Sequence, residues 1–298
     1  MLVPEVESQT LTLGDADTPA TTVPRTSRRR WSFGMVVSVG WLGLVVVSTI
    51  VANFLPLPDP DVADFLAIGA TPSRSHWMGT DEIGRDILSR AIYGARISLV
   101  VGIVSVILGM AVGGMLGLLA GYLRGLTEKV VMVLTDSLLA FPALVLLLCL
   151  AAVFGSNLTT LIVGLAILTV PTFTRLTRAN SMVVSTREYV LAARAYGSSP
   201  LRVILRDVVP NVAMPILAYS FIVMGVVIVA EGSLSFLGLG IPGPTPSWGS
   251  MVAGGRRDMA TKPHIVLMPG AVMFFTVLAL TVIGEKYRQR FDKREGAL

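Results

Sequence analysis

The chain has 298 residues, of which 53% are hydrophobic and 14% are charged, and 24 basic against 19 acidic residues give a net charge of +5. Soluble domains carry about 25% charged residues, so this composition excludes an ordinary soluble protein. One cysteine excludes an intrachain disulfide. The apolar residues are gathered in long runs, which indicates that a bilayer surrounds much of the chain.

The first 55 residues divide into a tail and a membrane span. Residues 1–32 combine a polar segment with a basic cluster at 25–30, and their composition predicts a disordered basic N-terminal tail. The apolar run 33–55 has no clear small-residue cleavage site, so it predicts a retained transmembrane helix rather than a signal peptide. Residues 56–96 are then expected to form an extracytoplasmic segment.

Within that segment, residues 80–96 predict an amphipathic helix at the outer membrane surface. Thr80 or Asp81 would cap it, and Asp86 and Arg90 stand four residues apart and can pair. Its apolar residues share one helical face: Ile83, Ile87, Leu88, Ala91, Ile92 and Ala95. The helix either braces the neighbouring spans or receives an external partner.

Five further apolar runs lie at 97–121, 130–153, 158–177, 211–236 and 264–284. Each is long enough to cross a hydrocarbon core of about 30 Å as a helix. The runs are continuous rather than alternating, which favours helices over a barrel. The predicted fold class is therefore an all-α integral membrane protein with about six transmembrane helices. It comprises a first helix at 33–55, a five-helix core at 97–284 and a C-terminal tail at 285–298.

Glycines in the run 97–121 are typical of close helix packing in membranes. They are Gly102, Gly109, Gly113, Gly114 and Gly117.

The distribution of basic residues predicts the orientation. If the N-terminus is cytoplasmic, 17 of the 24 lysines and arginines fall in cytoplasmic segments. The positive-inside rule therefore places both termini in the cytoplasm. It also accounts for the net positive charge without nucleic acid.

The longest cytoplasmic loop, 179–210, is expected to contain a short helix pair. Gly197 suits the position just past the first helix, and Ser199 with Pro200 suits the start of the second, which Pro210 would end. The small Ala192-Ala193 step offers a surface on which another protein can sit closely. The pair is either a mechanical handle for a soluble partner or an ordinary interfacial hairpin.

Charged residues within spans are expensive and therefore candidates for function. Asp136 lies on a transport pathway or pairs with a basic residue at the cytoplasmic end. Glu231 lines an outer cavity or closes the turn that follows it. Trp248 is the third candidate for a pathway or gate.

The stretch from Glu188 to Gly197, followed by Pro210 and Asn211, resembles the EAA loop of importer-type ABC transporter permeases. The form is that of the dipeptide and oligopeptide branch. Three positions depart from the general pattern: Leu191, Asp207 and Val209. The resemblance implies that contact with an ATPase is made by Glu188, Ala192, Ala193, Gly197, Pro210 and Asn211.

Three other motifs resemble the C-type peptide permeases of that branch. They are His76–Leu99, Glu231–Gly240 and Pro246–Gly249, and the likeness extends over about residues 33–290. By this resemblance the outer helix and the docking of a binding protein involve Gly79, Thr80, Asp81, Gly84, Arg85, Asp86 and Arg90.

The resemblance implies one permease subunit of an ATP-driven importer for peptides in the bacterial cytoplasmic membrane. The expected partners are a second homologous permease, cytoplasmic ATPase subunits, an extracytoplasmic solute-binding protein, a peptide-like solute and membrane lipids. The sequence has no G-x-x-x-x-G-K-[ST] loop, no nucleophile with a partnered base and no metal-ligand cluster. We therefore expect no catalytic, cofactor or metal residue in this chain, and ATP with Mg on the ATPase subunits. An importer of nickel or another small solute, and an ion-gradient-driven secondary transporter, are the alternatives.

Overall fold

The computed structural model describes residues 33–295, with side chains described through residue 289. The predicted disordered tail, 1–32, lies outside the described residues. Within the described part the regular elements are helices, and the one extended pairing is an isolated bridge between Thr80 and Asp86. The all-helical expectation is confirmed.

Five helices are long and apolar enough to cross a membrane, and a bent pair makes a sixth if it counts as one span. The five include α1 (Phe33–Val51), α2 (Ile87–Leu123), α5 (Leu158–Val184), α8 (Val209–Phe236) and α10 (His264–Glu295). The bent pair is α3 (Gly125–Ala140) and α4 (Ala143–Phe154). The short helices are η1 (Ala52–Phe54), α6 (Glu188–Ala195), α7 (Pro200–Val203), the π-helical turn η2 (Ile204–Val208), α9 (Trp248–Gly254) and η3 (Gly255–Arg257).

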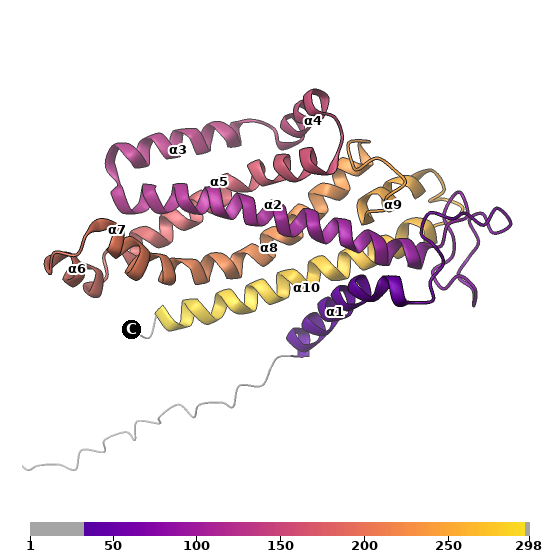
Figure 1. The fold of residues 1–298 in the computed structure, drawn as a ribbon, viewed down its shortest axis with the longest axis horizontal. Coiled ribbons are helices and arrows are strands. Elements are labelled where there is room, and N and C mark those ends of the chain that lie inside the picture. Colours follow the sequence, from indigo (N-terminus) through magenta and orange to yellow (C-terminus); the bar gives the residue numbers. More distant parts are fainter. Residues whose placement is uncertain (1–32, 296–298) are drawn as a thin grey trace, which may run out of the picture. The chain divides into compact units, whose positions relative to one another are not determined.

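The long helices run side by side, with α6 and α7 at one end and α9 with the 55–86 segment at the other (Figure 1). We call these the α6 end and the α9 end.

The predicted span at 130–153 is not one continuous helix, because the chain breaks between α3 and α4 and the two helices are bent by 84°. The break falls at Phe141 and Pro142. Proline disfavours helical backbone in the residue before it, and Phe141 is accordingly extended, with φ −75° and ψ 129°.

The predicted amphipathic helix at 80–96 is also wrong as a separate element. Residues 80–86 are not helical, and residues 87–96 form the first turns of α2. Asp86 is extended and caps α2, because its Oδ1 accepts a hydrogen bond of 2.8 Å from Ser89 N. Gly84, at φ +94°, prevents an earlier helical start.

The predicted C-terminal tail at 285–298 is helical as far as Glu295, since α10 continues past the apolar run. The Glu285 side chain accepts hydrogen bonds from Arg288 at 3.0 Å and Gln289 at 2.9 Å. Such pairs at spacings of three and four residues stabilise an exposed helix.

Helix α2 lies along α5 in an exceptionally close contact that depends on glycines. A Cβ added at Gly113 would lie 2.5 Å from the Val170 carbonyl oxygen, and one at Gly121 would lie 2.6 Å from the Arg178 carbonyl oxygen. A Cβ at Gly114 would meet only Thr177 Oγ1, at 3.9 Å. The expected close approach is confirmed for one glycine face of α2, and Gly114 is not on it.

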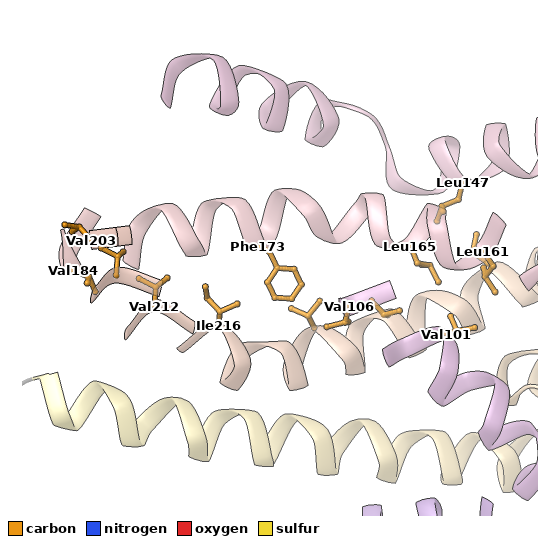
Figure 2. Packing of buried hydrophobic residues seen from close by; sticks show 14 of the residues in the cluster. Val101, Val106, Leu147, Leu161, Leu165, Phe173, Val184, Val203, Val212 and Ile216 are labelled. Atoms are coloured by element: carbon orange, nitrogen blue, oxygen red, sulfur yellow. The ribbon is translucent and has the colours of Figure 1, made fainter. Parts of the chain in front are cut away.

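The main hydrophobic core lies between α2, α5 and α8 and extends to the short helices. In Figure 2 the ring of Phe173 points from α5 toward α8, and the side chain is completely buried. At the α6 end, Val184, Val203 and Val212 close the same cluster (Figure 2). The short helices are therefore part of the core rather than a loose loop.

Candidate functional site

Helix α6 is a short exposed helix that contacts the core through Val190 and the partly buried Ala193. Val190 is completely buried in the main cluster, whereas Glu188 and Ala192 are exposed. The Arg194 guanidinium also lies 4.6 Å from the centre of the Tyr122 ring, at the end of α2. Helix α6 therefore contacts the spans on its inner face and leaves its outer face open.

The end of α6 is a Schellman motif, which confirms the predicted position of Gly197. Gly197 has φ +78°, and its N–H donates to the Arg194 carbonyl at 3.0 Å. The Ser198 N–H donates to the Ala193 carbonyl at 3.1 Å, which completes the motif. A Cβ at Gly197 would meet nothing within 4 Å, so only the backbone conformation requires glycine there.

The chain from Tyr196 to Leu205 presents large side chains to the surroundings at the α6 end. Tyr196 is 90% exposed, and Leu201 and Leu205 are also largely exposed. Exposed apolar residues gathered at one place on a protein mark a contact surface.

The predicted second helix of the pair is not a separate element. It starts at Pro200 as expected, but after α7 the chain passes through the π-helical turn η2 directly into α8. Pro210 does not end this helix, because it lies in the first turn of α8, where no intrahelical donor is required. Asn211 Nδ2 donates to the Asp207 carbonyl at 2.7 Å across the junction.

At the α9 end, three of the sequence motifs meet at one buried carboxyl group. Glu231 of α8 is completely buried and accepts hydrogen bonds from Ser235 Oγ at 2.9 Å and Ser247 Oγ at 2.8 Å. Ser98 Oγ of α2 lies 3.5 Å from its Oε2. The carboxyl group thus joins α2, α8 and the start of α9. These contacts support the alternative that Glu231 closes the turn after α8.

The three serines were not identified from the sequence. Their only signal is that each stands inside one of the motifs.

Trp248 belongs to the same junction. Its backbone N–H donates to Ser98 Oγ at 3.1 Å, and its Nε1 donates to the Ala91 carbonyl at 2.9 Å. The side chain is completely buried. A Cβ at Gly249 would lie 2.6 Å from Gly232 Cα, so the backbones of α9 and α8 touch.

The residues of the predicted outer site mainly contact one another and the neighbouring segment of the chain. Asp81 accepts hydrogen bonds from Ile83 N at 3.0 Å and Arg85 N at 2.9 Å, and pairs with Arg85 Nε at 2.7 Å. Thr80 is completely buried, and its N–H donates to the Ala70 carbonyl at 3.0 Å.

Two glycines of the predicted outer site allow the tight turns of this segment. Gly79 and Gly84 have φ of +80° and +94°. A Cβ at Gly79 would lie 2.5 Å from the Ala70 carbonyl oxygen. These contacts fit the bracing alternative, and docking of an external protein here stays a prediction.

The expected pairing of Asp86 with Arg90 is wrong. Asp86 Oδ2 lies 2.9 Å from His76 Nδ1, since its other oxygen caps α2. Arg90 instead donates to the Pro60 carbonyl at 2.7 Å and pairs with Asp61 at 3.3 Å.

Asp136 of α3 pairs with Arg175 of α5 at 2.6 Å. A basic partner was one of the two alternatives for Asp136, and both side chains of the pair are more than half exposed in this chain. A second ion pair, Glu128 with Arg178, joins the same two helices.

Within residues 33–295 no group of three or more His, Cys, Asp or Glu residues is arranged to hold a metal ion.

The comparisons with known proteins agree with this architecture. The family described as "Binding-protein-dependent transport system inner membrane component" matches residues 113–295, which is more than half of the chain. The glutathione transport system permease protein GsiD of Pectobacterium atrosepticum is 36% identical over 251 residues, covering 84% of this chain and 83% of that protein. GsiD of Escherichia coli O157:H7 is 36% identical over 266 residues, covering 89% and 88%.

Among solved structures, an inward-facing conformation of the MetNI methionine ABC transporter has a similar fold. A chain of it aligns with a TM-score of 0.58 at 16% identity, covering 69% of this chain and 97% of that one. A second crystal form aligns with a TM-score of 0.55. With the family match and the relatives, the chain belongs to the binding-protein-dependent transport family and is a multi-pass inner-membrane permease of a bacterial ABC importer.

Proposed function

We propose that this permease imports short peptides or peptide-like solutes, as one of two homologous permeases in the complex. Coupling to an ATPase is supported by one observation: α6 is an exposed helix that stands between two spans, α5 and α8. The solute class is supported by the relatives, whose names state transport of glutathione, a tripeptide.

In this proposal the α6 end faces the cytoplasm, and both termini lie on that side. The bias of basic residues toward those segments supports the orientation. Separate ATPase subunits bind ATP and Mg and dock on α6. Contact with them is assigned to Glu188, Ala192, Ala193, Gly197, Pro210 and Asn211, all of which are exposed except the partly buried Ala193. This chain hydrolyses nothing and binds no cofactor.

The α9 end then faces outward, where an extracytoplasmic binding protein delivers the solute. The break between α3 and α4 supports a pathway near the second permease. Backbone that leaves the helix at membrane depth is tolerated where it is buried in protein or lines a water-filled cavity. A cavity of about 310 Å³ lies beside the break, lined by Phe141, Pro142 and Pro171 among others.

Disulfide cross-linking tests the docking. Tyr196→Cys is paired with a cysteine on the ATPase in the assembled transporter, with and without ATP. Leu66→Cys is the matched control, because Leu66 is 99% exposed and lies in the 55–86 segment at the α9 end. Cross-links at position 196 that change with nucleotide, and none at 66, are expected. Equal labelling at both positions, or none at 196 in an assembled complex, would refute docking at α6.

Uptake measurements test the solute. The complete transporter in proteoliposomes should take up labelled glutathione and dipeptides in an ATP-dependent way. ATP-dependent uptake of Ni²⁺ without peptide uptake would favour the nickel alternative of the same branch. The ion-gradient alternative is set aside, because the family consists of components of binding-protein-dependent systems.

A further inference from the structure

A large apolar cavity lies between α1 and the first turns of α2, at the α9 end. Its volume is about 740 Å³, which is within the range of about 300–1,000 Å³ found for small-molecule sites. Leu44 and Val45 of α1 form one wall, Leu88 and Ile92 of α2 form another, and Trp248 closes the inner side. Positions 88 and 92 belong to the apolar stripe of 80–96, and with Ala91 and Ala95 they form the part of this stripe that faces the cavity.

The cavity is held open by polar contacts at its borders. Trp41 Nε1 donates to Thr276 Oγ1 at 3.1 Å, which ties α1 to α10. Arg96 Nε of α2 donates to the Thr49 carbonyl at 2.9 Å, which ties the end of α1 to α2. Between these ties the small residues Ala91 and Ala95 leave the space unfilled. The cavity is therefore a built feature of the fold.

Polar groups occur at one end of this lining. Arg74 and Trp77 are exposed, and Trp77 is 74% exposed, so they mark the mouth. In the described part of the chain the Arg74 side chain has no hydrogen bond or ion pair. Asp86 also lines the cavity, but its two oxygens are engaged by His76 and by Ser89 N. The available charge at the mouth is therefore positive.

We propose that this cavity binds one anionic phospholipid, with an acyl chain along the apolar walls and the phosphate at Arg74. An apolar body with a cationic mouth is complementary to an anionic amphiphile. A peptide is a poor occupant, because its amide groups would lose water without finding partners on these walls. Leu44 lines the cavity and is also 60% exposed on α1, so the acyl chain of the lipid can enter sideways from the bilayer.

Native mass spectrometry of the full-length chain in detergent tests the proposal. The probes are 1-palmitoyl-2-oleoyl phosphatidylglycerol and the matching phosphatidylcholine, added in equal amounts. One phosphatidylglycerol should be retained in preference to phosphatidylcholine by about fivefold, the factor equivalent to about 1 kcal/mol for one basic residue near an anionic lipid. Arg74→Gln should abolish the preference. Arg257→Gln is the matched control and should keep it, since Arg257 is exposed and does not line the cavity.

Filling the cavity separates a specific site from lipid that coats the whole surface. Ser48→Phe from α1 and Ile92→Trp from α2 should each reduce the retention of both lipids. Two variants from different helices are used so that the test still stands if one of them misfolds. Equal preference in Arg74→Gln and Arg257→Gln, or full retention in both filled variants, would overturn the proposal. A cross-link from Leu44→Cys to the second permease in the assembled transporter would overturn it too. The assay contains no transport step, so it can fail while the proposed import function stands.

Discussion

The glycine contact between α2 and α5 allows a test with two neighbouring residues. In Gly113→Ala the new Cβ would lie 2.5 Å from the Val170 carbonyl oxygen, 2.9 Å from Phe173 Cβ and 3.1 Å from Thr174 N. Two of these are backbone atoms in a helix, which cannot rotate away as a flexible side chain can. In Gly114→Ala the nearest atom is Thr177 Oγ1 at 3.9 Å, an ordinary contact distance.

The two substitutions change helix propensity equally, so their difference isolates the packing. Alanine in place of glycine inside a helix gains about 1 kcal/mol. Forcing extra atoms into a packed interface costs about 1–3 kcal/mol. We therefore expect Gly114→Ala to be neutral or stabilising, and Gly113→Ala to be less stable than Gly114→Ala by about 1–3 kcal/mol.

Thermal unfolding of the purified chain in one detergent, followed by the loss of monodisperse protein, measures this difference. Assembly with its partners should be unaffected by Gly114→Ala. If both variants change the unfolding temperature by the same amount in the same direction, the close contact does not exist as described and the reasoning from it fails.

Three further predictions concern other parts of the chain. Glu231→Ala should lower the unfolding temperature more than Glu231→Gln, because losing every acceptor leaves buried serine hydroxyls unpaired at about 1–3 kcal/mol for each group; equal effects would contradict the junction. Gly197→Ala should destabilise the end of α6 by about 1–2 kcal/mol because φ is positive there, and should speed hydrogen exchange of nearby amides. Gly43→Ala, which also meets nothing within 4 Å and has ordinary φ, should show no such loss. Burial, followed by the nearby charge of Asp81, raises the pKa of Glu82. The folded state then binds that proton more tightly than the unfolded state, so stability falls as pH rises from the ordinary glutamate pKa to the raised one, and Glu82→Gln should flatten the fall. An unchanged pH profile would contradict it.

The sequence was sufficient to predict that the long apolar runs are helical, because continuous rather than alternating apolar residues favour helices over a barrel in a bilayer. It also predicted Gly197 correctly, since a glycine just after a helix satisfies a local rule. Local rules failed where the outcome depends on distant partners. Asp86 and Arg90 had the spacing of a helical pair, yet Asp86 pairs with His76 and Arg90 pairs with Asp61. Nothing in the spacing shows that these residues lie nearby.

Pro142 and Pro210 also show where local sequence rules are insufficient. Both are helix breakers by local chemistry, but only Pro142 interrupts a helix, since Pro210 stands in a first turn where its missing N–H has no partner to lose. The buried residues Val208 and Val212 continue the core across the start of α8. The position of a proline relative to the helix start therefore decides whether it interrupts the helix.

The contacts also divide the chain into rigid and adaptable parts, which bears on the proposed coupling. Helices α2 and α5 meet backbone to backbone, and Glu231 ties α2, α8 and α9 at the other end, so these helices are suited to move as one body. The regular hydrogen-bond ladder changes at the break at Phe141–Pro142 and at the π-helical turn η2. Transport by rigid-body rotation requires joints of this kind at the edges of a stiff unit. If the proposed function holds, η2 is the joint through which a movement of α6 reaches α8. Deleting one residue would shorten η2 to a regular α-helical turn. This deletion should uncouple ATP hydrolysis from uptake while leaving the α2–α5 contact intact.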